Sequence, residues 1–434
     1  MAKIDIRERD ISPIITTAET NAAYIPGFKS DGQAMEPTLF TSVDKFIAAV
    51  KPYKFINDQT HDTKGLGNFP KAGSYDPSYL YAVQLLSSGL SILYEAYPVT
   101  IVESGDDSNR VSSDASTVNE LYKKFYGENS SLDKLLDKNE YTFKFLTSGA
   151  YPVFDYCVAS GDSDTYPIIN KMLTIAAKRG DIIALIDHAD KDTVSRTSSQ
   201  LITNVKERLN NIAQVNNEDV QKYGAMFTPW CNYSLVSEIT DYSEGGNTYL
   251  PGSFAYLSCV ANSIKNNPNW YAVAGVTRGQ INNLVQPQVN ISGADADILQ
   301  VDDSYSVNPI MRIKPYNYCI WGNRTLNPNT KGLVASSYLN IRMLTNDVKK
   351  VVYQAAQKLT FELNNEVLWL NFKSEIQPIL DKMVSGNGLS GYKIIKKDTT
   401  KKATIEAIIR LYAIEAVENW DITIELSDSY ISVE

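Results

Sequence analysis

Two segments of the sequence carry side chains that could form a hydrolytic site. DIIALIDHAD, residues 181–190, is a short apolar run that ends in Asp187, His188 and Asp190. LPGSFAYL places Ser253 directly after a glycine, where a helix is expected to begin. A serine that a histidine deprotonates, with a carboxylate to orient the histidine, is the chemistry of a serine hydrolase. The polar end of a strand in an α/β domain is also where ligands often bind.

The local arrangement of these residues argues against that chemistry. The order Asp, His, Ser suits a subtilisin-like hydrolase, but Asp187 and His188 are adjacent, so an extended chain directs them to opposite sides. Ser253 does not lie in a GxSxG nucleophile elbow. A serine at the start of a helix is better explained as an N-cap. We therefore expect no catalytic residues and no enzyme, with a hydrolase kept as the alternative.

The remaining motifs predict no cofactor and no metal site. SGNGLSG, residues 385–391, lacks the Lys-Ser/Thr of a phosphate-binding loop and follows a helix where such a loop would precede one. It is typical of a helix C-cap and turn. The cysteines show no CxxC spacing and are expected to be buried free thiols: Cys157, Cys231, Cys259 and Cys319. The only histidines are His61 and His188, which limits general-base chemistry.

Composition narrows the class of protein further. With 434 residues and 43% hydrophobic residues, the chain can build several folded domains. The net charge of −9 argues against a general nucleic-acid binder, because neutralising phosphates requires a surplus of Lys and Arg on one face. The charged N-terminus does not resemble a secretory signal, and no apolar run is long enough to cross a membrane. We expect a soluble, cytoplasmic chain without membrane insertion.

The apolar pattern predicts a layered α/β domain, because strand and helix periods alternate from about residue 98. Ser42 is predicted as the N-cap of a first helix, and a second helix is predicted to begin near Asp76, with a strand from Val99 to Val102 after it. Residues 281–304 are expected to be irregular. Further helices are predicted at 165–180, 196–214, 251–264, 345–362 and 366–388, and strands at 181–190, 225–233, 316–326, 389–398 and 404–428.

Both ends of the chain have the period of a half-buried strand. In ENWDITIELSD, residues 418–428, four apolar side chains share one face and Asp421, Thr423 and Glu425 share the other. The apolar face consists of Trp420, Ile422, Ile424 and Leu426. Near the N-terminus Ile4 and Ile6 alternate with Asp5 and Arg7. Because an unpaired strand edge is a row of open hydrogen-bonding groups, each terminal strand requires a partner.

Five segments, in order along the chain, resemble the tail sheath family of contractile bacteriophages and related injection machines. The strongest match is NPIMRIKPYNYCIWGNRTL, with Asn308–Ile310 and Trp321–Leu326. SYLNIRMLTNDVKK resembles a family strand that leads into a helix, and FELNNEVLW resembles Phe-Glu-Pro-Asn followed by Leu-Trp, with Leu363 in place of the proline. The other two are NAAYIPGFKSDGQAMEPTLFTSVDKFIAAV and YGAMFTPWCNY.

The resemblance implies an α/β and α+β multidomain protein. It implies a subtilisin-like α/β outer domain that is not a protease, an inner C-terminal α+β domain, and extended β-strand arms at both termini. On this sequence the implied parts are an N-terminal arm at 1–20, an N-terminal α/β part at 21–97, the outer domain at 98–300, the inner domain at 301–417 and a C-terminal arm at 418–434.

The resemblance also implies a non-enzymatic function. Family members stack as six-subunit rings around an inner tail tube and contract to drive the tube through a cell envelope. The implied partners are copies of this chain, the tube protein, and baseplate and tail terminator proteins, in a virion assembled in the host cytoplasm. By analogy, Lys349 and Lys350 would face the tube, and the terminal strands would pair with the inner domains of neighbouring subunits.

Three functions remain open on the sequence. They are a sheath subunit of a phage, bacteriocin or injection system, a hydrolase with a subtilisin-like domain, and an α/β binding protein. Without the resemblance, pairing of the terminal strands within their own chain would be the simpler expectation.

Overall fold

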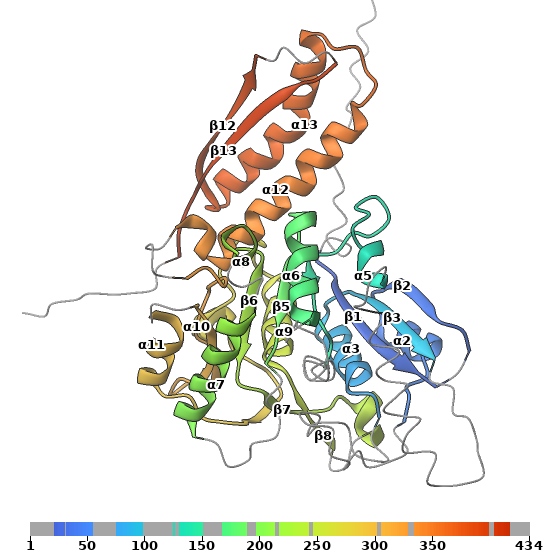
Figure 1. The fold of residues 1–434 in the computed structure, drawn as a ribbon, viewed down its shortest axis with the longest axis vertical. Coiled ribbons are helices and arrows are strands. Elements are labelled where there is room, and N and C mark those ends of the chain that lie inside the picture. The colour runs from blue at the N-terminus through green and yellow to red at the C-terminus, as the bar shows by residue number, and fades with distance from the viewer. Residues whose placement is uncertain are drawn as a thin grey trace, which may run out of the picture.

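The computed structural model divides the chain into a large body and a smaller unit (Figure 1). The body, residues 21–328, is α/β; the C-terminal unit, residues 339–413, contains two helices and two strands. The structure describes residues 21–30, 32–54, 75–98, 125, 130–150, 167–188, 197–212, 217–242, 246–301, 305–328, 334–398 and 403–416.

A single mixed sheet of eight strands forms the centre of the body, in the order β11-β10-β6-β5-β4-β1-β3-β2. The six inner strands run parallel, and β11 and β2 join the two edges antiparallel. The strands are β1 (Ala23–Lys29), β2 (Met35–Phe40), β3 (Ile92–Pro98), β4 (Phe145–Leu146), β5 (Ile183–Ile186), β6 (Gly224–Thr228), β10 (Asn308–Arg312) and β11 (Tyr318–Ile320).

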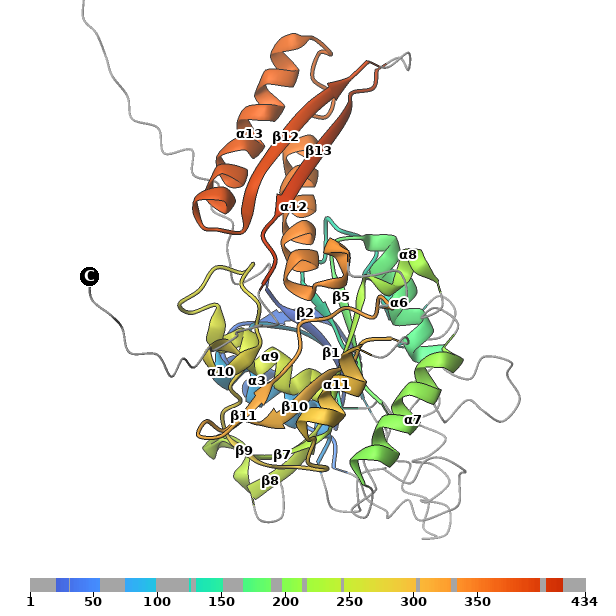
Figure 2. The same cartoon turned by 90° about the vertical axis from the view of Figure 1, so that its left-hand side faces the viewer.

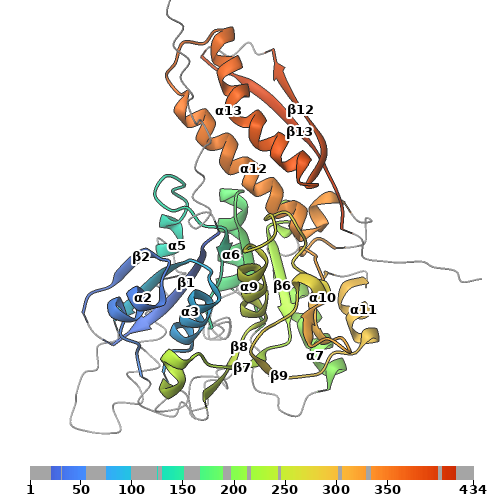
Figure 3. The same ribbon diagram turned by 180° about the vertical axis from the view of Figure 1, so that it is seen from behind.

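Helices cover both faces of this sheet, as Figures 1 and 3 show from opposite sides. One face packs against α5 (Ser131–Lys134), α6 (Pro167–Arg179), α7 (Ser198–Asn211) and α11 (Gly293–Val301). The other packs against α2 (Val43–Ala49), α3 (Pro77–Ser88) and α9 (Gly252–Ser263). The described residues also form two short helices and two 3-10 turns. These are α8 (Glu218–Gln221), α10 (Gly275–Arg278), η3 (Ser237–Tyr242) and η6 (Ala335–Ser337).

The strand β5 explains why both faces need a cover. Ile183 and Leu185 enter the core beneath α9, whereas Ala184 and Ile186 enter the core beneath α6. Because successive side chains of a strand point to opposite faces, a continuous apolar run is buried only in a sheet that is covered twice. The body also contains a small antiparallel sheet in the order β8-β7-β9. Its strands are β7 (Cys231–Ser234), β8 (Asn247–Leu250) and β9 (Leu284–Pro287).

The C-terminal unit is a helical hairpin covered by a two-stranded sheet (Figure 2). It consists of α12 (Leu339–Lys358), α13 (Glu366–Ser385), β12 (Leu389–Lys397) and β13 (Glu406–Ala413). Leu344 and Val348 of α12 meet Leu380 and Met383 of α13 and Leu389 of the sheet in a small core. This core is separate from the two cores of the body.

Much of the predicted secondary structure is confirmed. Ser42 is the N-cap of α2, and α3 follows Asp76, whose carboxylate accepts a hydrogen bond from the Ser78 N–H. Helices lie in five of the predicted ranges, at α6, α7, α9, α12 and α13. Three of the four cysteines, Cys231, Cys259 and Cys319, are buried free thiols as expected, and Cys157 lies outside the described residues.

Three local predictions are wrong, and the strand expected from Val99 to Val102 lies outside the described residues; the strand described just before it is β3, Ile92–Pro98. AMFTPWCNY forms two strands in different sheets, β6 and β7, divided at a cis Thr228–Pro229 bond. Residues 281–304, expected to be irregular, contain β9 and α11. SYLNIRM does not form a strand, because α12 already begins at Leu339.

The large sheet also crosses two of the implied domain limits. Strands β1 to β3 precede residue 98, and β10 and β11 follow residue 300, yet all five pair into the same sheet as β5 and β6. The part that separates from the body in space begins at α12. The mixed α/β class is confirmed; the subtilisin-like description of the outer domain stays a prediction.

We expect Gly252→Ala to destabilise the body by roughly 2–3 kcal/mol, because α9 packs directly on β6 at this residue. A Cβ at Gly252 would lie 2.1 Å from the Phe227 carbonyl oxygen, which is backbone and cannot rotate away. Gly293→Ala is the matched control, since a Cβ there meets nothing within 4 Å. Urea denaturation of both variants measures the difference; equal midpoints would contradict the close approach.

Candidate functional site

The side chains of Asp187, His188 and Ser253 lie near one another but do not form a catalytic relay. His188 Nε2 is 2.9 Å from Thr228 Oγ1, and Ser253 Oγ is 3.1 Å from the hydroxyl of Tyr81. Among the described residues no hydrogen bond joins His188 to either Asp187 or Ser253. All three side chains are buried, so a substrate could not reach them. Asp190 and His61 lie outside the described residues.

Asp187 instead caps helix α9 from the neighbouring strand. Its Oδ1 accepts a hydrogen bond from the Ser253 backbone N–H at 2.9 Å, and its Oδ2 has no hydrogen-bond partner. Burial raises the pKa of this carboxyl to about 7, against a smaller opposing effect of the Ser253 hydrogen bonds. The prediction of Ser253 as the N-cap is therefore wrong, because Pro251 occupies the cap position and a distant carboxylate satisfies the helix end.

A polar joint holds α12 against the amino ends of β4 and β5. Asn346, fully buried on α12, donates a hydrogen bond to the Ile182 carbonyl at 3.1 Å and accepts one from Arg342 Nε at 3.2 Å. The next residue, Asp347, forms an ion pair of 2.8 Å with Lys144, whose side chain is only 2% exposed. Lys144 directly precedes β4 and Ile182 directly precedes β5. The joint therefore connects α12 to the centre of the large sheet.

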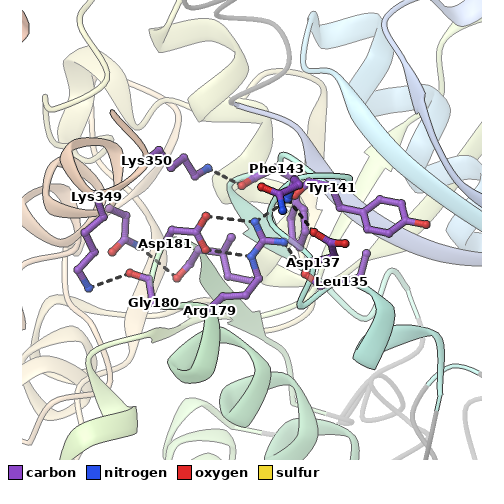
Figure 4. A network of polar contacts seen from close by, with 12 residues as sticks. Leu135, Asp137, Tyr141, Phe143, Arg179, Gly180, Asp181, Lys349 and Lys350 are labelled. Carbon is purple, nitrogen blue, oxygen red and sulfur yellow. Dashed lines mark hydrogen bonds and ion pairs between the residues drawn. The ribbon is translucent and has the colours of Figure 1, made fainter. Parts of the chain in front are cut away.

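Arg179 organises the body side of this joint (Figure 4). Its guanidinium forms a bidentate ion pair with Asp181, at 2.9 and 3.1 Å, and donates to the carbonyls of Leu135 and Tyr141. It also lies over the ring of Phe143, 4.7 Å from the ring centroid. A buried guanidinium with this many acceptors fixes the loop that precedes β4, because each donor finds a partner of defined direction.

The two lysines predicted to face a tube have partners inside the chain (Figure 4). Lys349 donates to the Gly180 carbonyl at 2.8 Å and to the hydroxyl of Tyr223 at 3.0 Å. Lys350 is buried, donates to the Phe143 carbonyl, and has its pKa lowered by burial to about 8. These contacts give both lysines a role in the joint, and contact with a tube stays a prediction.

Trp270 provides a second attachment of the C-terminal unit. Its indole N–H donates to the Gly386 carbonyl at 2.9 Å, and its ring packs on the turn between α13 and β12. A Cβ at Gly388 would lie 2.7 Å from this ring, so the turn accepts only glycine without a shift. The glycine-rich segment SGNGLSG forms this turn, with Gly386 as the C-cap of α13. The predicted C-cap and turn are therefore confirmed.

The sheet of the C-terminal unit has no third strand among the described residues. Within the described residues β12 pairs only with β13 and β13 only with β12. One face of this sheet, with Tyr392, Ile394, Ile409 and Leu411, packs on α13. The other face is turned to solvent. There Lys393 stands directly opposite Arg410, a pairing of like charges that costs stability unless negative charge lies nearby.

The predicted terminal arms cannot be placed. Ile4, Ile6, Trp420, Ile422, Ile424 and Leu426 lie outside the described residues. Within the described ranges no helix is long and apolar enough to cross a bilayer, and no group of His, Cys, Asp and Glu side chains is arranged to hold a metal ion.

Sequence analysis missed the joint residues Lys144, Arg179, Asp181 and Asn346. A signal was present on α12, where Arg342, Asn346 and Lys350 recur every four residues on the face that also carries Met343. Polar residues at helical spacing within a buried stripe indicate a polar contact with another element. The partner could not be inferred, because it lies in the segments that directly precede β4 and β5, more than 150 residues earlier in the chain.

Sequence comparison finds tail sheath proteins of two bacteriophages. The protein of Vibrio phage KVP40 is 27% identical over 156 residues, which are 36% of this chain and 22% of that protein. The protein of Enterobacteria phage T4 is 23% identical over 161 residues, which are 37% of this chain and 23% of that protein. The aligned part thus spans less than a quarter of these curated relatives. No protein-family model matches the chain.

Structural comparison extends over almost the whole chain. A chain of the contracted anti-feeding prophage baseplate matches with a TM-score of 0.65 at 16% identity, covering 98% of both chains. The contracted sheath complex of the PVC extracellular injection system matches with a TM-score of 0.56 at 13% identity, covering 99% and 98%. The contracted helical sheath of the anti-feeding prophage matches at 0.55 and 14%, covering 99% of both.

The predicted resemblance to contractile tail sheath proteins is confirmed. The structural matches establish the sheath fold, and the phage relatives carry the sheath name. Asp187, His188 and Ser253 are buried and form no His-centred relay among the described residues, which argues against the hydrolase alternative.

We expect Asp187→Asn to flatten the dependence of stability on pH. A carboxyl whose pKa is about 7 in the folded protein and about 4 in the unfolded chain binds its proton more tightly when folded, so stability falls as the pH rises through that interval. Asparagine cannot ionise and can still accept from the Ser253 N–H. At pH 8 the variant should be more stable by roughly 2–4 kcal/mol.

Denaturant unfolding at pH 5 and pH 8 provides the test for Asp187. Asp219→Asn, at a side chain that is 95% exposed, serves as the control. The same change in stability between the two pH values in wild type and Asp187→Asn would show that this carboxyl does not carry the effect.

We expect Asn346→Ala to destabilise the protein by about 1–3 kcal/mol, because it leaves the Ile182 carbonyl and Arg342 Nε buried without a partner. Gln354→Ala, at an exposed position of the same helix, should change stability by no more than about 0.5 kcal/mol. Thermal unfolding measures both, and a neutral Asn346→Ala would mean that water replaces its contacts at no cost.

Proposed function

We propose that this chain is a structural sheath subunit, which assembles as stacked rings of six around an inner tail tube and contracts to drive the tube into a target cell. One observation carries the proposal: the fold matches chains of contracted sheath structures over 99% of this chain and at least 98% of those chains. The names of the phage relatives agree with it. Such a subunit has no catalytic residues and needs no cofactor.

Strand addition between subunits would join the rings. The part of the chain that the structure describes adds no third strand to either edge of the C-terminal sheet, and the chain has two terminal segments with strand period. A segment from a neighbouring copy that adds to an edge gains a backbone ladder, and its apolar face extends the layer on α13. At about 0.5–1.5 kcal/mol per hydrogen bond each link is modest, but the links repeat around every ring.

The distribution of charged side chains favours the edge of β12 as the place where the C-terminal segment of a neighbouring copy would pair. Lys393 and Lys397 lie four residues apart on the solvent face of β12, the same spacing as Asp421 and Glu425 on the polar face of residues 418–428. If Trp420 and the three apolar residues that alternate with it continue the layer on α13, the two carboxylates come to the solvent face beside the lysines. The β13 edge offers Arg410 and Glu406 and thus no comparable surplus of positive charge.

Contraction would draw on free energy stored in the extended array. The C-terminal units would stay linked while the bodies move outward and bury new surface between them, without nucleotide hydrolysis. Polar contacts with the tube, which screening and water weaken, would let the tube slide. Baseplate and terminator proteins would lie at the ends of the array. The particle would be assembled in the host cytoplasm.

The proposal covers sheath subunits of both phages and contractile injection systems. The curated relatives are phage proteins, and the structural matches include extracellular injection systems, so both origins stay within the proposal.

Negative-stain microscopy of the purified full-length chain tests the sheath function. We expect hollow striated cylinders, and we expect deletion of residues 1–12 to abolish them while far-UV circular dichroism stays that of the folded chain. Monodisperse particles at all concentrations, with intact termini, would contradict the proposal.

We expect Lys393→Glu with Lys397→Glu to block assembly, because four like charges would meet along the added strand. Adding Asp421→Lys and Glu425→Lys should restore cylinders by reversing both sides of the pairing. The matched control is Lys373→Glu with Lys382→Glu, on α13 away from the strand edges. Cylinders of normal length from the first double variant would show that the segment does not lie along β12.

A further inference from the structure

A polar cavity of about 170 Å³ lies beside the joint, between α12 and the body. The charged side chains around it are Lys138, Arg179, Asp181, Lys349 and Lys350. The remaining lining comes from uncharged polar side chains, among them the amides of Gln354 and Gln357. No apolar side chain other than the ring of Tyr353 takes part, so the cavity suits water or a polar ligand.

Positive charge exceeds negative charge around this cavity. Asp181 is the single lining carboxylate and is already bound by Arg179 through two hydrogen bonds. The nearby carboxylate of Asp347 pairs with Lys144. Lys138, Lys349 and Lys350 therefore have no ion pair within the described part of the chain.

The polar partners of these lysines are neutral and leave donors free. Lys349 donates to a carbonyl and a tyrosine hydroxyl, and Lys350 to a carbonyl. Lys138 lies over the ring of Tyr353, 5.6 Å from its centroid. Each ammonium carries three N–H donors, so hydrogen-bonding capacity remains on all three lysines. Burial lowers the pKa of both Lys349 and Lys350, and for Lys350 this effect exceeds the opposing influence of Asp347 and Asp181.

We propose that this cavity binds a tetrahedral oxyanion of the phosphate class. Lys138 comes from the loop after α5, whereas Lys349 and Lys350 come from α12, so one anion contacted by all three would connect the body with the C-terminal unit. Lysine is a common phosphate ligand as a compact point charge, and amide N–H groups supply further donors. The cavity exceeds the volume that several water molecules occupy, which leaves room for such an ion.

Isothermal titration of the full-length chain with inorganic phosphate tests this site, with sodium chloride holding the ionic strength constant. We expect one phosphate bound per chain and a higher unfolding temperature in phosphate than in chloride. Adenosine monophosphate as a second titrant distinguishes free phosphate from a phosphate monoester: competition between the two assigns the site to both sources, and binding of inorganic phosphate alone assigns it to the free ion.

Three lysine variants locate the ion. Lys138→Gln with Lys349→Gln should weaken phosphate binding by at least about tenfold, because two of the three charges are lost. Lys358→Gln, on the same helix but paired with Glu375 outside the cavity, should bind as the wild type does. Lys138→Gln alone changes a side chain at the cavity rim without a buried hydrogen bond and should weaken binding in a folded protein.

Two results would overturn the site. One is no heat of binding up to about 10 mM phosphate, a concentration above any Kd that three charge-assisted contacts would give. The other is equal affinity in the wild type and in the folded Lys138→Gln variant. Because these measurements need no assembled sheath, their failure is distinguishable from failure of the proposed function.

Discussion

One helix, α12, takes part in two hydrophobic cores, and the arrangement of the molecule depends on this. Leu339 and Met343, in its first turns, are buried in a core of the body, whereas Leu344 and Val348 are buried against α13. A helix is stiff along its axis because every peptide bond is hydrogen-bonded within it. The position of the C-terminal unit is therefore set by packing on both sides of one rigid element.

Buried polar and charged contacts fix the orientation of α12 on the body. Apolar packing alone tolerates sliding, whereas the Lys144–Asp347 ion pair and the contact of Asn346 with Ile182 each have a single geometry. The cost of burying these groups is high unless every partner is present, so a shifted helix would leave several of them unsatisfied. The joint therefore fixes the angle between the C-terminal unit and the body.

The sequence predicted most elements whose period is long and regular, and it failed where pairing partners are distant. The amphipathic pattern of residues 345–362 predicts α12, and the apolar run at 181–190 predicts β5. By contrast, AMFTPWCNY has the composition of one strand but divides at Thr228–Pro229 between two sheets. The joint was not predictable, because the face of α12 indicates a polar contact without naming its partner.

The sequence by itself determined the class of fold, the absence of a workable triad at Asp187, His188 and Ser253, and the similarity to sheath proteins, since periodicity and local motifs follow from the covalent order of residues. Tertiary structure alone decided that β10 and β11 join the sheet of the first hundred residues, that Asp187 caps a helix 66 positions away, and that Lys349 and Lys350 lie in the joint. These features depend on which surfaces meet in space, and a linear pattern carries no distance between residues far apart in the chain.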